Sequence, residues 1–71
     1  METVFFKEQD FKETLTGFVF TMKCDDAENK KFGIEALQPD GSYEEIIVLT
    51  TAKNDTFEIH EQPFEGRVLY T

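Results

Sequence analysis

Period-two alternation of apolar and polar residues is the feature that most restricts what this chain can fold into. It is clearest in residues 18–24, where one set of alternate positions is apolar: Phe18, Phe20, Met22 and Cys24. Because side chains alternate across a strand, these four residues share one face. The pattern predicts a strand that is half-buried, with this face turned inward.

Four more segments have strand-like patterns and are separated by clusters of Gly, Pro, Asn and Asp. Residues 31–37 and 56–61 alternate, and we expect the first of them to form a hairpin with residues 18–24. Residues 43–51 are apolar on both faces at Ile46–Leu49, which predicts a central strand covered on each side. Residues 67–70 predict a short last strand at an edge.

Two short segments carry local signals. Residues 38–42, Gln-Pro-Asp-Gly-Ser, predict a tight turn because Pro presets φ, Asp bonds its own backbone and Gly accepts positive φ. Residues 8–16 are compatible with two structures. The Asp and Glu of residues 10–13 have capping-box spacing, which predicts a short helix, whereas the threonines at 14 and 16 favour a strand.

The pattern as a whole predicts one mainly β domain over residues 1–71. Consecutive strands with short connections are usually neighbours, so the simplest topology is an antiparallel meander of five to six strands. We expect it to form a small barrel or a strongly curled sheet, because closure removes exposed edges. The alternatives are an open sheet with a short N-terminal helix on one face and a dimer that pairs edge strands.

Charge restricts the partners. Fifteen acidic residues against seven basic ones give a net charge of −8. Such a balance disfavours direct binding to nucleic acid or to anionic membranes and favours a protein partner with a basic surface. The N-terminal residues 1–7 lack the pattern of a secretory signal, and the single Cys24 cannot form an internal disulfide. We therefore expect a cytoplasmic protein.

We expect no metal or other cofactor. Cys24 and His60 supply at most two of the four ligands of a structural zinc site. The oxygen-rich residues 25–29 lack the spacing of an EF-hand loop, so a solvated acidic loop is the better interpretation. Cys24 lies on the predicted buried face, where a thiol is unreactive.

We also expect no catalytic activity. The carboxylate pairs Glu44–Glu45 and Glu58–Glu61 would need an apolar pocket to act in acid–base chemistry, and a chain this small has little room for one. Four aromatic residues fall outside the main alternating faces: Phe5, Tyr43, Phe64 and Tyr70. They are either anchors of an interface or part of a second core, and the sequence leaves both open.

The sequence favours a protein-binding module or inhibitor whose acidic surface blocks a basic, nucleic-acid-binding site on a partner protein. The expected partner-binding residues are Asp25, Asp26, Glu28, Tyr43, Glu44, Glu45, Glu58 and Glu61. In size and charge alone, without a shared motif, the chain is similar to small phage-encoded inhibitors of host defence. The alternative is an accessory module that binds a partner or dimerises through an edge strand, with charge serving solubility. We expect a monomer or a homodimer.

Overall fold

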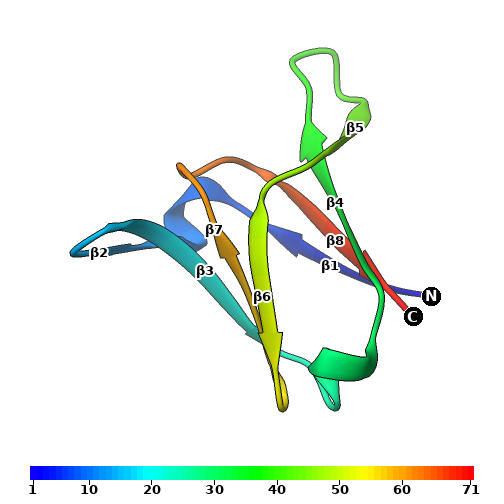
Figure 1. The fold of residues 1–71 in the computed structure, drawn as a ribbon. Coiled ribbons are helices and arrows are strands. Elements are labelled where there is room, and N and C mark those ends of the chain that lie inside the picture. The colour runs from blue at the N-terminus through cyan, green and yellow to red at the C-terminus, as the bar shows by residue number, and fades with distance from the viewer.

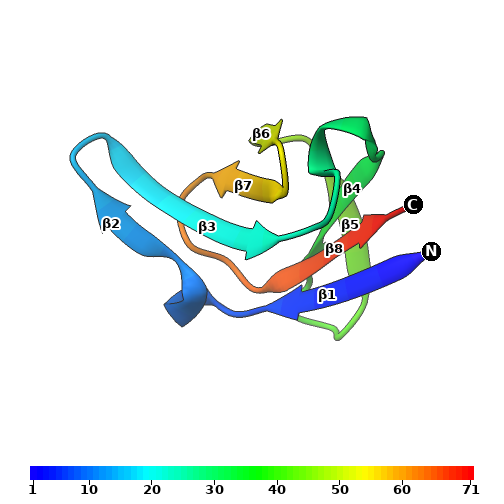
Figure 2. The same cartoon turned by 90° about the horizontal axis from the view of Figure 1, so that it is seen from below.

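The computed structural model describes residues 1–71 as two four-stranded antiparallel sheets that enclose one core (Figures 1 and 2). Sheet A contains, in spatial order, β1 (Glu2–Phe6), β8 (Gly66–Tyr70), β4 (Phe32–Leu37) and β5 (Tyr43–Ile46). Sheet B contains β2 (Lys12–Thr14), β3 (Gly17–Lys23), β7 (Thr56–His60) and β6 (Leu49–Lys53). The 3-10 turns η1 (Glu8–Asp10) and η2 (Ala27–Asn29) complete the fold. No helix has the length and apolar character needed to cross a membrane.

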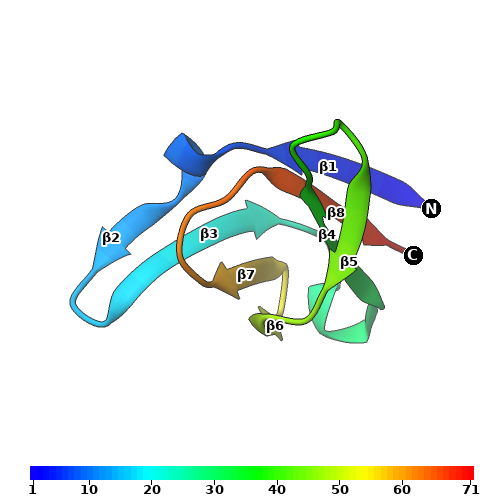
Figure 3. The same cartoon turned by 90° about the horizontal axis from the view of Figure 1, so that it is seen from above.

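The chain changes sheets after β1 and then after each hairpin of two strands. β2–β3 and β6–β7 are hairpins of sheet B, β4–β5 is a hairpin of sheet A, and β1 pairs with β8 in sheet A. At one side β1 continues through η1 into β2, and at the other β5 continues into β6 (Figure 3). The two sheets remain separate. The predicted mainly β, antiparallel fold is confirmed, whereas the single meander closed into a barrel is wrong.

Three predictions about individual strands are also wrong. β3 and β4 do not form a hairpin, because they lie in different sheets. β8 is not an edge strand: it lies between β1 and β4, where its glycine is required, since a Cβ at Gly66 would overlap the carbonyl oxygen of Glu35. The apolar run at 46–49 is not one central strand. It breaks at residues 47 and 48, where the chain switches sheets, and Ile47 is 100% exposed.

The predicted inward faces are confirmed. Sheet B contributes Phe20 and Met22 from β3 and their cross-strand partners Ile59 and Phe57 from β7. Sheet A contributes the cross-strand pair Ile34 and Val68. The ring of Phe57, only 1% exposed, stacks on Phe32 of sheet A with ring centroids 3.9 Å apart. Contacts of this kind join the two sheets.

The ambiguous segment 8–16 is not a helix. A single 3-10 turn occupies Glu8–Asp10, where the Lys7 N–H donates to the Asp10 carboxylate at 2.8 Å, and strand β2 follows. Phe11 is buried, whereas Leu15 is fully exposed at the tip of the β2–β3 hairpin. The threonine signal was therefore the correct one.

We predict that Phe57→Ala lowers the free energy of unfolding by about 3 to 5 kcal/mol, because it empties the contact between the sheets. Leu15→Ala removes an apolar side chain that touches no core, and we expect it to change stability by about 0.5 kcal/mol or less. Urea unfolding followed by circular dichroism measures both. Equal destabilisation by the two variants would contradict this description of the core.

Candidate functional site

The β4–β5 hairpin projects away from the rest of the molecule (Figure 1). Its tip is the predicted turn at residues 38–42, which is confirmed: Gly41 has φ of 90°, and the Gln38 N–H donates to the Ser42 carbonyl at 2.7 Å. The Ser42 hydroxyl and N–H both donate to Asp40 Oδ1, at 2.6 and 2.9 Å. These hydrogen bonds lower the pKa of Asp40 below its ordinary value, and the bond from the hydroxyl has the larger effect.

Carboxylates concentrate on this hairpin. Asp40, Glu44 and Glu45 are all exposed, and the chain has no Lys or Arg from Phe32 to Ala52. Residue Glu65 lies alongside, because its carbonyl accepts the N–H of Leu37 at 2.9 Å. We call the β4–β5 hairpin with these three exposed carboxylates the acidic hairpin.

An open groove of about 470 Å³ runs along the base of the acidic hairpin. Its walls come from residues 36–39 on one side and residues 63–65 on the other, with Glu8 from η1. No lysine or arginine lines it, so the groove extends the negative surface toward the body of the protein.

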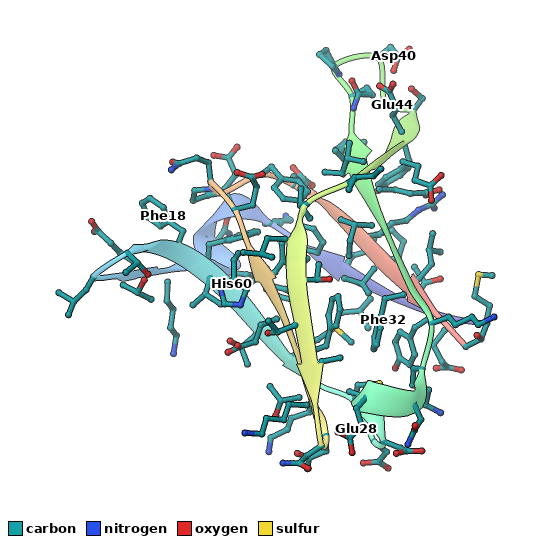
Figure 4. The ribbon with its side chains drawn as sticks, viewed as in Figure 1. Phe18, Glu28, Phe32, Asp40, Glu44 and His60 are labelled. Atoms are coloured by element: carbon teal, nitrogen blue, oxygen red, sulfur yellow. The ribbon has the colours of Figure 1, made fainter.

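The predicted acidic residues Asp25, Asp26 and Glu28 lie at the opposite end of the molecule, as the labels of Glu28, Asp40 and Glu44 in Figure 4 show. Their loop is tied to the β6–β7 turn by two backbone bonds, Cys24 N–H to Asp55 O and Ala27 N–H to Asn54 O, at 2.8 and 2.7 Å. The joined segments 23–31 and 53–55 contain four carboxylates and four lysines. This balanced end therefore has no excess negative charge.

Two further predicted residues lie on or beside β7: Glu58 on the outer face of sheet B and Glu61 directly after the strand ends. Glu58 is half-buried and accepts bonds from the hydroxyls of Thr21 and Thr51, at 3.1 and 3.3 Å. Its charge is thus engaged within the sheet. Glu61 lines an open pocket of about 420 Å³ together with Phe18 and His60, whose positions on β3 and β7 are visible in Figure 4.

The outer face of sheet B also holds a hydroxyl–imidazole–carboxylate group that the sequence did not reveal. Thr51 Oγ1 lies 3.2 Å from His60 Nε2, and Glu58 Oε1 lies 3.6 Å from the same nitrogen. In a catalytic triad the carboxylate contacts the other ring nitrogen and orients the imidazole. Here both groups approach Nε2, so this arrangement does not supply an activated hydroxyl. No cluster of metal-binding side chains is present either.

The structure brings together only part of the predicted site. Tyr43, Glu44 and Glu45 lie on one arm, whereas the remaining five predicted residues are divided between the balanced end and sheet B. The charge balance of residues 23–31, three lysines against three carboxylates, is visible in the sequence. The sequence does not show that the β4–β5 hairpin projects away from the body, whereas this loop packs against the β6–β7 turn.

The four unassigned aromatic residues divide equally between core and surface. Phe64 packs against Phe6, with ring centroids 5.1 Å apart, and Tyr70 packs against Phe32 at 5.4 Å. Burial is the main reason that the pKa of Tyr70 is raised. Phe5 and Tyr43 lie instead on the outer face of sheet A, with ring centroids 6.2 Å apart.

Comparisons with known proteins assign no function to these surfaces. No known protein family matches the sequence, and no curated protein or solved structure is significantly similar to it. Function is therefore inferred from geometry and charge.

We predict that Ser42→Ala raises the pKa of Asp40 toward its ordinary value. The substitution removes the hydroxyl that donates to Asp40, and this hydrogen bond is the largest cause of the shift. A carboxyl group with a depressed pKa in the folded state adds stability above its unfolded pKa, and this is lost as pH falls through the folded pKa. Carbon-detected NMR titration of the Asp40 carboxyl measures the shift. An unchanged titration would show that Ser42 does not hold this charge.

Proposed function

We propose that this protein is a non-catalytic binding module or inhibitor that inserts its acidic hairpin into a basic, nucleic-acid-binding site of a partner protein. The observation that carries the proposal is the position of Asp40, Glu44 and Glu45 on a projecting arm that has no basic residue. A groove built to bind phosphates presents clustered Lys and Arg, which attract such an arm.

Electrostatics gives this interaction a defined character. Complementary charge accelerates association, and salt screens it over a Debye length of about 8 Å at physiological ionic strength. The carboxylates of the acidic hairpin are exposed, so their charge acts through solvent on an approaching partner and is screened by salt. Binding through them should therefore be fast and should weaken steeply as salt increases.

The catalytic alternative has less support. Cys24 is buried in the core, and the Thr51–His60–Glu58 group lacks the geometry that activates a hydroxyl. The charged groups of the acidic hairpin are all carboxylates, and the one with a shifted pKa, Asp40, is shifted toward the ionised form. A general acid would need the opposite shift.

One observation favours a second candidate, an accessory module that binds a partner strand. β6 is an edge of sheet B, and every one of its residues is exposed. Leu49 and the preceding Ile47 are exposed apolar side chains, and β6 contains no proline or inward charge that would block pairing. Strand addition at this edge would give affinity through backbone bonds and would resist salt.

We predict that the hairpin variant Asp40→Asn, Glu44→Gln, Glu45→Gln loses partner binding by about tenfold or more, equivalent to about 1.4 kcal/mol. The matched control is Asp25→Asn, Asp26→Asn, Glu28→Gln, which removes the same number of charges from the balanced end. Tagged proteins are used to capture binders from lysate of the natural host at low and high salt, with quantification by mass spectrometry. We expect salt-sensitive enrichment of nucleic-acid-binding proteins with the wild type and the control.

Two results would contradict the proposal. Equal loss in both variants would show that net charge alone, rather than the acidic hairpin, determines binding. Partners that persist at high salt and tolerate the hairpin variant, but are lost after Thr51→Pro in β6, would favour the accessory module.

A further inference from the structure

One row of side chains crosses the whole outer face of sheet A. The strand register aligns Phe5 of β1 with Arg67 of β8, Arg67 with Glu35 of β4, and Glu35 with Glu45 of β5. Arg67 Nε donates to Glu35 Oε1 at 2.6 Å, which neutralises this pair. Glu45 stands directly opposite Glu35 and forms no ion pair. Like charges opposed across strands are unfavourable, so the row lacks one cation.

Phe5 is the aromatic member of this row, and the ring of Tyr43 lies beside it. Phe5 belongs to a strand, yet its side chain is 64% exposed. The guanidinium carbon of Arg67 lies over the ring of Tyr43, 4.1 Å from its centroid, and the Phe5 ring packs against the same tyrosine at 6.2 Å. We call Phe5, Tyr43 and Arg67 the aromatic platform.

The aromatic platform is already assembled without a partner. The bond to Glu35 and the contact with Tyr43 hold the Arg67 side chain in place, so little side-chain freedom remains to be lost on binding. Tyr and Arg are among the residue types that dominate binding energy at protein interfaces. Tyr43 also begins β5, so the platform is continuous with the acidic hairpin.

We infer that the aromatic platform receives an exposed apolar side chain of a basic partner protein, and that a neighbouring Lys or Arg of the partner pairs with Glu45. This inference rests on the proposed function for the charge of the partner. It adds the recognition element: the partner must present an apolar residue flanked by cations. The carboxylate of Glu45 then gains the opposite charge that the row of sheet A lacks.

Other occupants of this face fit less well. A second copy would bring another acidic hairpin to the same interface, and each chain carries a net charge of −8. Repulsion between like charges opposes that contact. Phosphates of a nucleic acid would be repelled by the same carboxylates. A partner with cations around an apolar residue complements both the aromatic platform and the unpaired carboxylate of Glu45.

The test uses two synthetic peptides of equal length and equal positive charge. One contains only Lys, Arg, Gly and Ser, and the other has Leu in place of its central Ser. Each is titrated into isotopically labelled protein and followed by NMR of the backbone amides. We expect the leucine peptide to bind about tenfold more tightly, equivalent to about 1.4 kcal/mol, because its apolar side chain leaves water on binding. Its shifts should centre on residues 3–5, 43–45 and 67–69.

Three variants separate this inference from the proposed function. Phe5→Ala should abolish the advantage of the leucine peptide but leave binding of the charge-only peptide unchanged. Leu15→Ala removes another exposed apolar residue, at the tip of the β2–β3 hairpin of sheet B, and should leave the advantage intact. The triple neutralisation of the acidic hairpin should weaken both peptides. Amide spectra of the free variants verify that each remains folded.

Equal affinity for the two peptides, or an advantage that survives Phe5→Ala, would overturn the aromatic platform while leaving the acidic hairpin in place. Charge-only binding that is insensitive to neutralising the acidic hairpin would instead refute the proposed function. A dimer seen by sedimentation that disappears in Phe5→Ala would assign this face to a second copy and would also overturn the inference.

Discussion

The fold depends on one constraint, which is that no hairpin of this chain can bury its own apolar face. A two-stranded hairpin is only marginally stable alone. Phe57 and Ile59 of sheet B are buried in one core cluster with Ile34 and Val68 of sheet A, and Phe32 of sheet A stacks on Phe57. The chain meets this requirement by moving to the opposite sheet after each pair of strands, and every other feature of the architecture follows from that alternation.

The same alternation determines where functional groups can lie. The inward faces are occupied by the core, so charged residues are left to outer faces and to the ends of hairpins. At the β3–β4 end, two neighbouring connections meet and mix carboxylates with lysines. The β4–β5 hairpin extends beyond its neighbours and meets no lysine-bearing loop, so Asp40, Glu44 and Glu45 form no ion pair. Local isolation, rather than net charge, thus distinguishes this arm.

Sequence was sufficient where the controlling interactions are local. The inward face of residues 18–24 and the turn at 38–42 followed from side-chain alternation and from the preferences of Pro, Asp and Gly. Strand partners were not predictable, because pairs such as Val4 with Val68 join residues at opposite ends of the chain. The same limit hid the ion pair between Glu35 and Arg67 and the contact of Arg67 with Tyr43. The apolar run Ile46–Leu49 led to a wrong prediction of one central strand. A corner where the chain passes from one sheet to the other can be as apolar as a strand that is covered on both faces.

The interior position of β8 has a consequence for how the protein is made in a cell. β8 holds β1 and β4 together, yet it lies near the C-terminal end of the sequence. A ribosome-bound chain that has not yet released residues 66–70 cannot assemble sheet A, and sheet B then lacks its cover. Sheet A is therefore completed only after these residues are synthesised, and its β1–β8 and β4–β8 ladders are long-range pairings, which form slowly. Until then the phenylalanine-rich strands stay exposed, and the strong negative charge of the nascent chain is what keeps one copy from associating with another.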